Sequence, residues 1–272
     1  MTRLTSATPL ATIPTPTFEQ LALGIDEDWF KPCAVIPVYN HERTLPAVVS
    51  ALRDQDLPCI LVDDGSSPVA AATIDALAER AGVFLVRHAV NQGKGGAVTS
   101  GLREASRLGF SHALQVDADG QHDLGSVSLF LDRACQAPDA VVCGYPLYDA
   151  SVPKGRLYAR YLTHVWVWIN TLSLSIRDSM CGFRVYPLRQ TLALLDSTRL
   201  GKRMDFDTEI LVRLFWREQP IVWLPTRVHY PLDGVSHFRL WRDNLLISAM
   251  HARLFGGMLV RAPKLLCRRW RE

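Results

Sequence analysis

Between Cys33 and Cys143, short apolar runs alternate with segments of helical periodicity, and this alternation constrains the fold more than any other feature. Runs with so few polar residues are typical of strands that are buried on both faces of a sheet. Helical segments of this length connect parallel strands through right-handed crossovers. The pattern therefore predicts an α/β fold with a Rossmann-like, mostly parallel sheet flanked by helices. The predicted strands are Cys33–Val38, Cys59–Val62, Val83–Arg87, Ala113–Val116 and Ala140–Cys143, and the helices between them are Thr44–Asp54, Pro68–Ala81, Gly95–Leu108 and Leu124–Cys135.

After Gly144 the regular alternation stops. We expect, in order, a long helix over Gly155–Ile176, a strand over Cys181–Tyr186, a helix over Asp205–Trp216 and a strand over Ile221–Val228. These elements complete one globular domain at residues 29–240. A leader at 1–28, rich in Thr, Pro and Ala and expected to be flexible, precedes it, and a helix with a basic tail follows at 241–272.

The last predicted helix, from about Phe238 to Leu259, is amphipathic. Its apolar face repeats at steps of three and four residues and consists of Trp241, Leu245, Ala249, Ala252, Phe255 and Leu259. Such a face either covers the sheet or lies on a membrane. The tail from Arg261 onward is basic, and anionic lipids attract Lys and Arg side chains. We expect the helix to pack on the domain and the tail to touch the membrane.

Composition limits the class of protein. With 48% hydrophobic and 21% charged residues, the chain has the composition of a folded globular protein. Its formal net charge of +3 gives no reason to expect a nucleic-acid partner. Six cysteines without a CxxC pair favour free thiols in a reducing compartment. We find neither a signal peptide nor an uncharged apolar run of about 20 residues. We therefore predict a cytoplasmic protein, peripheral at most at the inner face of the membrane.

Two carboxylates follow the fourth predicted strand, where ligands bind in parallel sheets. Asp117 and Asp119 stand two residues apart, so they can converge on one hard cation. Mg²⁺ prefers one or two carboxylates together with substrate phosphate oxygens, and such a metal would neutralise the charge on a departing diphosphate. A solvated acidic loop is the alternative. A calcium-binding loop is excluded because Gln121 and His122 occupy positions where its pattern needs other residues.

Two further segments have the character of a nucleotide site. Asp63-Asp64-Gly65-Ser66 ends the second strand, and its carboxylates could accept hydrogen bonds from a ribose or a base N–H. An ordinary turn followed by a helix cap would have the same sequence. Asn91-Gln92-Gly93-Lys94-Gly95-Gly96-Ala97 precedes a helix, where glycines, a helix N-terminus and a lysine can cradle a diphosphate. A flexible connector is the alternative there.

One pair of arginines stands out on the predicted long helix. Arg156 and Arg160 lie one turn apart, so they could clamp an anion. Taken alone, a solvated basic face explains the pair better.

Together these motifs resemble the inverting family 2 glycosyltransferases, most closely the branch that is similar to dolichol-phosphate mannosyltransferases. They follow the family's order over roughly residues 33–240. The matching segments are Ile36-Pro37-Val38-Tyr39-Asn40-His41-Glu42, Val62-Asp63-Asp64-Gly65-Ser66, Asn91-Gln92-Gly93-Lys94-Gly95-Gly96-Ala97, Asp117-Ala118-Asp119-Gly120-Gln121-His122, Asp178-Ser179-Met180-Cys181-Gly182-Phe183-Arg184, and Arg227 with Gly234-Val235-Ser236.

The resemblance implies a GT-A fold and a hexosyltransferase. The donor would be a GDP- or UDP-hexose, the acceptor a lipid-linked molecule with polyprenyl phosphate as first candidate, and the cofactor Mg²⁺ or Mn²⁺. It places the metal at Asp117 and Asp119, and it reverses the isolated interpretation of Arg156 and Arg160, which look like the arginines that bind a polyprenyl-phosphate headgroup.

The site residues that the resemblance and the motifs imply form two groups. The expected substrate-binding residues are Pro37, Tyr39, Asn40, Glu42, Asp63, Asp64, Gly65, Ser66, Asn91, Gly93, Lys94, Gly95, Asp117, Ala118, Gln121, Arg156, Arg160, Arg227 and Ser236. The expected catalytic residues are Asp119, Asp178, Glu209 and Arg184.

Other functions remain open at the level of sequence. His41 displaces Glu42 by one residue relative to the family pattern. The loop of Arg227 and Ser236, which the resemblance places over the donor diphosphate, also departs from that pattern. The base and the sugar of the donor are therefore undetermined. A hydroxyl acceptor, as in a glycolipid, pigment or polysaccharide precursor, would need a general base, for which Asp178 or Glu209 would be candidates. A phosphate acceptor is already anionic at pH 7. A non-catalytic nucleotide-sugar binding module is expected to lack the metal carboxylates, which are present here.

Overall fold

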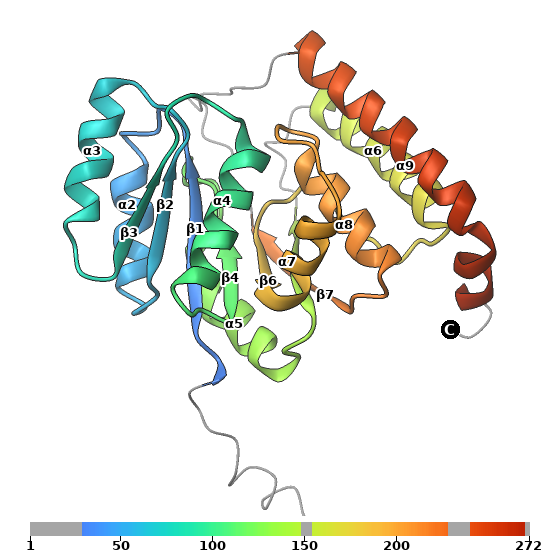
Figure 1. Cartoon of the computed structure of the whole chain (residues 1–272), viewed down its shortest axis with the longest axis horizontal. Coiled ribbons are helices and arrows are strands. Elements are labelled where there is room, and N and C mark those ends of the chain that lie inside the picture. Colours follow the sequence, from blue (N-terminus) through green and yellow to red (C-terminus); the bar gives the residue numbers. More distant parts are fainter. Residues whose placement is uncertain (1–28, 148–153, 228–239, 270–272) are drawn as a thin grey trace, which may run out of the picture.

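Seven strands form one sheet at the centre of the molecule, in the order β3-β2-β1-β4-β6-β5-β7 (Figure 1). The computed structural model describes residues 29–147, 154–227 and 240–269. The strands are β1 (Pro32–Val38), β2 (Cys59–Asp63), β3 (Val83–Arg87), β4 (His112–Gln115), β5 (Val141–Leu147), β6 (Arg184–Pro187) and β7 (Ile221–Arg227). All neighbours pair in parallel except β6, which runs antiparallel to β4 and β5. The predicted mostly parallel sheet is confirmed.

Helices cover both faces of the sheet (Figure 1). They are α2 (Leu45–Arg53), α3 (Pro68–Ala78), α4 (Lys94–Arg107), α5 (Val127–Gln136), α6 (Lys154–Thr171), α7 (Leu188–Ser197), α8 (Phe206–Trp216) and α9 (Leu240–Arg269), with the 3-10 turn η2 (Leu124–Ser126) before α5. Each helix and strand predicted from the sequence is present, with shifted ends. Helix α7 is not among the predicted elements, because it follows β6 directly and no loop separates the two patterns.

The core lies on both sides of β1. Cys33 and Val35 belong to a cluster that includes residues of α4 and α8, whereas Ala34 and Ile36 belong to a second cluster with residues of α2 and α5. All four side chains are fully buried. Because both faces of this strand are covered, its sequence is a continuous apolar run rather than an alternating one.

The strand order reverses at β1, which pairs with β2 on one side and with β4 on the other. Loops that leave the carboxyl ends of strands at such a switch point separate, and ligands bind in the crevice between them. The polar motifs of the first, second and fourth strands therefore meet at one edge of the sheet.

The C-terminal helix is longer than expected and packs by a different face. It continues to Arg269, so residues 261–269 of the expected basic tail belong to α9, and residues 270–272 lie outside the described part of the chain. Its buried residues are Asp243, Met250, His251, Leu254, Met258 and Leu265, and the helix contacts α6 and α8. The predicted packing face points outward instead, since Trp241 is 88% and Leu245 72% exposed. The expectation that this face covers the domain is wrong.

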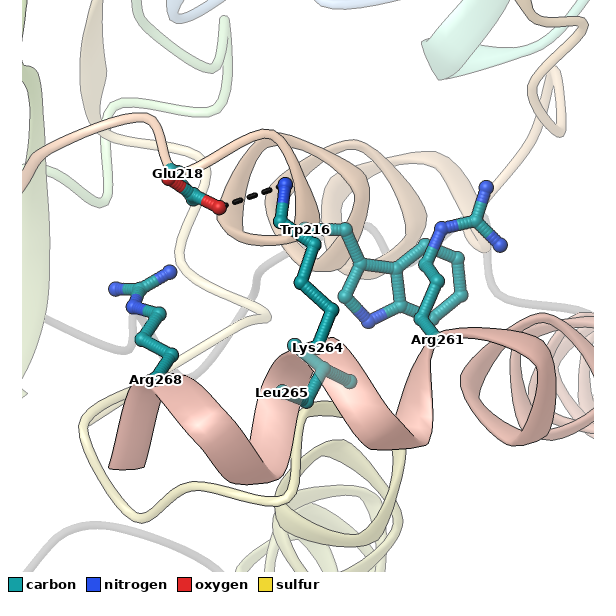
Figure 2. A pocket seen from close by; sticks show the side chains of 6 residues that line it. All are labelled: Trp216, Glu218, Arg261, Lys264, Leu265 and Arg268. Carbon is teal, nitrogen blue, oxygen red and sulfur yellow. Dashed lines mark ion pairs between the residues drawn. The ribbon is translucent and has the colours of Figure 1, made fainter. Parts of the chain in front are cut away.

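The last turns of α9 rest on the end of α8 (Figure 2). The guanidinium carbon of Arg261 lies 4.7 Å from the ring centroid of Trp216. Lys264 Nζ is 2.7 Å from Glu218 Oε1, and Leu265 is buried. These side chains line a small pocket of about 90 Å³. Arg261 and Lys264 thus contact the protein itself, and the expected contact between the tail and a membrane stays a prediction.

Candidate functional site

The two candidate metal carboxylates lie just beyond the carboxyl end of β4. They line a pocket of about 110 Å³ whose walls also include Gln121, His122, Arg160 and Gly182. The backbone N–H of Gln121 donates to Asp119 Oδ1 at 3.0 Å. The Thr44 hydroxyl donates to the Ala118 carbonyl at 2.6 Å, which fixes this loop against the start of α2. The structure therefore brings Asp117, Asp119 and Gln121 together as expected.

A half-buried lysine, Lys94, is paired with Asp117. Lys94 Nζ lies 2.8 Å from Asp117 Oδ1 and 3.0 Å from Asp207 Oδ2, and His122 Nε2 lies 3.4 Å from Asp117 Oδ2. Burial alone would raise the pKa of the Asp117 carboxyl, but Lys94 and His122 outweigh it and hold that pKa well below its usual range. Burial would likewise lower the pKa of Lys94, but the two carboxylates raise it. Asp117 and Lys94 are therefore both charged at neutral pH.

The glycine-rich loop differs from the predicted diphosphate cradle. The Lys94 side chain turns to the carboxylates, and the backbone N–H of Gly96 donates to the Lys202 carbonyl at 2.9 Å. Gly93 has a φ of 96°, and a Cβ at this position would lie 2.6 Å from the Lys202 carbonyl oxygen. Gly95 follows in the first turn of α4. Close packing against the segment before α8 thus explains the glycines.

Asp64 organises the same loop from within. Its carboxylate accepts hydrogen bonds from the backbone N–H groups of Gln92 at 2.8 Å and Gly93 at 2.7 Å, and it lies 2.7 Å from His88 Nδ1. The Asn91 side chain donates to the Asp64 carbonyl at 3.1 Å. Asp64 is buried, and its carboxylate holds the loop. The predicted contact of Asp64 with a nucleotide stays a prediction.

Asp63 has a similar internal role. It is buried and accepts hydrogen bonds from Arg87 Nε at 2.8 Å and from the Ser66 N–H at 2.9 Å. Gly65 between them has a φ of 73°, and a Cβ there would lie 2.8 Å from the Asn91 nitrogen. These contacts show the expected turn, and the predicted nucleotide contact of this segment stays a prediction.

The loop after β1 adjoins this turn. Asn40 adopts a left-handed conformation with a φ of 57°. Its N–H donates to the Ser66 hydroxyl at 3.2 Å, and its side-chain oxygen accepts from the Ser67 N–H at 2.7 Å. Pro37 and Tyr39 are half-buried beside it. Glu42 Oε2 is buried and has no hydrogen-bond partner among the described residues, so this predicted binding residue keeps an unused acceptor.

Arg160, which lines the pocket, holds the buried Asp178 in an ion pair. Arg160 Nε donates to Asp178 Oδ2 at 2.6 Å, and His164 Nε2 lies 3.6 Å from the same oxygen. The backbone N–H groups of Met180 and Cys181 donate to Asp178 Oδ1 at 2.8 and 2.7 Å. Burial would raise the pKa of Asp178, but His164 and Arg160 lower it to about 2. Asp178 is therefore a weak base at neutral pH.

Three other predicted residues lie beside or within segments that the structure does not fully describe. Arg156 belongs to the first turn of α6, one turn before Arg160, and only its backbone is described. Arg227 ends β7 with an exposed side chain, and its carbonyl accepts a hydrogen bond from the Asp123 N–H at 3.3 Å. Ser236 lies outside the described residues.

The structure does not support Glu209 as a general base. Its side chain is fully buried and lies 2.8 Å from Arg213 Nη2 and 3.2 Å from Arg253 Nη2. It also accepts a hydrogen bond from the Gly201 N–H at 2.8 Å. Glu209 thus joins α8, α9 and the loop before α8, and it does not line the pocket of Asp117 and Asp119.

Arg184 is also an internal residue rather than a group that reaches substrate. Its side chain is fully buried and donates to the carbonyls of Asp207 and Ser179, both at 2.7 Å. The second of these bonds supports the segment that carries Asp178, so Arg184 shapes the pocket from behind.

Sequence patterns missed three residues of the site. Asp207 shares Lys94 with Asp117, but it lies on α8 and no local motif marks it. His122 follows the two carboxylates and approaches Asp117. His164 stands four residues after Arg160, and this helical spacing was a usable signal for a shared partner.

The donor set fits a divalent cation that is shared with a substrate. Among the described residues, no group of three or more His, Cys, Asp or Glu side chains is placed to hold a metal ion. Asp117 and Asp119 supply the one or two carboxylates that Mg²⁺ takes from a protein when phosphate oxygens complete its shell. A protein-only metal cage is therefore not the type of site present in this part of the chain.

Solved structures with the same fold include glucosyl-3-phosphoglycerate synthase from Mycobacterium tuberculosis in complex with Mn²⁺, UDP-glucose and phosphoglyceric acid. The TM-score is 0.64 at 16% sequence identity, and the alignment covers 90% of this chain and 86% of that one. At this identity the likeness concerns the fold, and it confirms the GT-A prediction.

Curated relatives are similar in sequence over the catalytic region. The UDP-N-acetylglucosamine–dolichyl-phosphate N-acetylglucosaminyltransferase of Methanococcus voltae is 26% identical over 195 residues, which are 65% of this chain and 77% of that protein. The polyprenol monophosphomannose synthase of Mycolicibacterium smegmatis is 28% identical over 184 residues, 62% of this chain and 66% of that protein. Residues 33–192 match the family described as glycosyl transferase family 2. This match covers more than half of the chain and agrees with the GT-A fold, so the chain is a glycosyltransferase and belongs to glycosyl transferase family 2.

Proposed function

We propose that this protein transfers a hexose from a nucleotide sugar to polyprenyl phosphate with inversion at the anomeric carbon. The names of the relatives support the acceptor class, because they include enzymes of dolichyl phosphate and polyprenol phosphate. The complexes of the M. tuberculosis synthase with Mn²⁺ and UDP-glucose support the donor class and the type of metal. The enzyme would work at the cytoplasmic face of a membrane, where a lipid-linked acceptor presents its phosphate.

The ion pair between Arg160 and Asp178 carries the choice of acceptor. A hydroxyl acceptor needs a general base. Asp178, with a pKa of about 2, is a weak base, and Glu209 is buried and paired with Arg213 and Arg253. A phosphate acceptor already carries the charge of a nucleophile and needs a cation to hold it. Arg160 lines the pocket that contains Asp117 and Asp119, so one cavity offers both a metal ligand set and an anion-binding group.

The chain's own residues then position the two reactants. Arg160 would orient the acceptor phosphate so that one of its oxygens attacks the anomeric carbon while the bond from that carbon to the donor diphosphate breaks. Lys94 would remain paired with Asp207, which lies 3.0 Å from its Nζ, when Asp117 turns to other ligands. A bound Mg²⁺ or Mn²⁺, held by Asp117 and Asp119, would neutralise the charge on the departing diphosphate.

A direct comparison of two acceptors tests this function. Purified protein is incubated with labelled UDP- and GDP-hexoses, Mn²⁺, and either a polyprenyl phosphate or the polyprenol of equal length. We expect labelled lipid only with the phosphate, and an anomeric configuration opposite to that of the donor by NMR. If transfer to the polyprenol were equally fast or faster, the proposed phosphate acceptor would be wrong and a hydroxyl acceptor would be favoured.

A further inference from the structure

The outer side of α6 is apolar although it faces away from the protein. The segment from Tyr161 to Ile176 contains no Asp, Glu, Lys or Arg. Its exposed residues, which recur at helical spacing, are Tyr161, Leu162, Val165, Trp166 and Ile169. A soluble helix normally places charged residues on its outer face, so this surface requires an apolar neighbour.

Helix α9 extends this apolar surface. Figure 1 shows α6 and α9 side by side at one end of the molecule, and the two helices are in contact. The rings of Trp166 and Phe255 meet edge to face with centroids 6.3 Å apart, which joins the outer sides of both helices. Trp241, Leu245 and Leu259 continue the surface along α9 and are exposed.

The charges of α9 are complementary to an anionic surface. Its sequence contains Arg242, Arg253, Arg261, Lys264, Arg268 and Arg269 but only one acidic residue. That residue, Asp243, is buried. Arg253 and Lys264 pair with Glu209 and Glu218. Arg242 and Arg261 are exposed, and the stacking of Arg261 on Trp216 leaves its charge in place. Such basic side chains beside an apolar, aromatic-rich face are typical of helices that lie in the plane of a membrane interface.

We propose that the outer faces of α6 and α9 form a docking surface for an anionic lipid bilayer. Docking to a bilayer does not depend on which acceptor the enzyme uses. It nevertheless rests on the proposed function for its role, because α6 connects the pocket to the docking surface. Arg160 in the pocket directly precedes the exposed Tyr161 and Leu162. A polyprenyl phosphate embedded in the bilayer can then present its headgroup to the pocket along α6 while its chain stays in the lipid.

The helices lie on the bilayer rather than across it. Within the described residues, α9 is the one helix that is long and apolar enough to cross a membrane by length and composition. However, its inner face is packed on the domain, and Arg253 Nη2 lies 3.2 Å from the buried Glu209. Spanning the bilayer would expose this buried carboxylate and break these contacts.

A matched pair of variants tests the docking surface. The double variant Leu162→Glu/Leu245→Glu places charges on the proposed surface, at residues that are 63% and 72% exposed. Val69→Glu makes the same change at a residue of α3 that is 68% exposed. In flotation with phosphatidylcholine–phosphatidylglycerol vesicles, we expect wild type and Val69→Glu to bind and the double variant to bind at least tenfold more weakly. Unchanged melting temperatures would verify the folding of both variants.

A measurement on the unaltered surface complements the variants. Trp241 is strongly exposed, so vesicles should shift its emission to the blue and brominated lipids should quench it, relative to Trp241→Phe. Each of three outcomes would overturn the proposal. They are a wild type that does not float, a double variant that floats as well as wild type, and Trp241 emission that does not change when vesicles are added. A wild-type dimer that does not float and that the double variant dissociates would also overturn it, because the surface would then join two copies of the chain.

Activity separates docking from acceptor choice. The double variant should lose at least tenfold in transfer to a long-chain polyprenyl phosphate in vesicles, but keep transfer to a short, water-soluble polyprenyl phosphate. Equal loss with both acceptors would overturn the docking role. If wild type floats but glycosylates neither phosphate, the docking surface stands and the proposed acceptor fails.

Discussion

At the scale of single residues, Asp119 is the carboxylate on which the proposed metal depends most directly. Asp117 already pairs with Lys94 at 2.8 Å, whereas the contact of Asp119 is a hydrogen bond from the Gln121 backbone. We predict that Asp119→Asn abolishes transfer and leaves the melting temperature unchanged. The control Asp132→Asn, at an exposed residue, should keep both the melting temperature and full activity. Activity that persists in EDTA, or in Asp119→Asn, would remove the metal from the mechanism.

Asp207 has a subtler effect on the same site because it competes for Lys94. It lies 3.0 Å from Lys94 Nζ, so its loss should leave the lysine paired with Asp117 alone. We predict that Asp207→Asn weakens Mn²⁺ binding in the presence of UDP about tenfold, equivalent to about 1.4 kcal/mol, by calorimetry. Asp196→Asn removes the partner of an exposed ion pair with Arg103 and should leave it unchanged. Mn²⁺ that binds Asp207→Asn as tightly as wild type would contradict this sharing.

The pH dependence of transfer should report the acceptor rather than Asp178. The pKa of Asp178 is about 2, because His164 and Arg160 overcome the effect of burial, so this carboxylate stays ionised throughout the working range. The second pKa of a phosphate monoester is about 6. We predict that kcat/KM rises with pH through about 6 and that a phosphonate acceptor, with its higher second pKa, moves this rise upward. A rise that stays in place would assign the titration to the protein.

At the scale of elements, Glu209 tests whether α8 has a structural or a chemical role. Its fully buried carboxylate pairs with Arg213 and Arg253. Removal of one partner from such a cluster costs about 3–5 kcal/mol, so Glu209→Gln should be strongly destabilised in urea, unlike the exposed control Glu79→Gln. The kcat per folded molecule should change little. A stable Glu209→Gln that has lost kcat would restore Glu209 as the general base.

Elements with one clear pattern were predictable, and elements with two were not. Buried parallel strands such as β1 have continuous apolar sequences, and their polar ends locate the pocket. Helix α9 has apolar residues on both sides, since Met250, Leu254 and Met258 form the buried stripe and Trp241 and Leu245 form the outer one. Periodicity alone could not decide which stripe packs. The Lys94–Asp207 pair was unpredictable for another reason, because it joins helices that are distant in sequence.

At the scale of the whole molecule, α6 connects a polar pocket to an apolar surface. The first half of the helix carries Arg160, which lines the pocket with Asp117 and Asp119. The remainder turns an uncharged side outward next to α9. A lipid with an anionic headgroup has the same division between a charged end and an apolar chain. The position of the pocket beside this surface therefore matches the shape of the proposed acceptor better than that of a soluble sugar or sugar phosphate.

The last turns of α9 either stabilise the fold or form the membrane contact, and a shortened chain distinguishes the two roles. Arg261 stacks on Trp216, Arg268 lies over Phe215 with its guanidinium carbon 4.5 Å from the ring centroid, and Leu265 is buried. A buried Leu contributes about 1.5–3 kcal/mol and each cation–π contact about 0.5–1 kcal/mol. A chain that ends at Val260 should therefore melt several degrees lower, yet bind anionic vesicles through α6 and the rest of α9 when assayed well below its melting temperature. Unchanged melting together with lost vesicle binding would instead make the last turns of α9 the membrane contact.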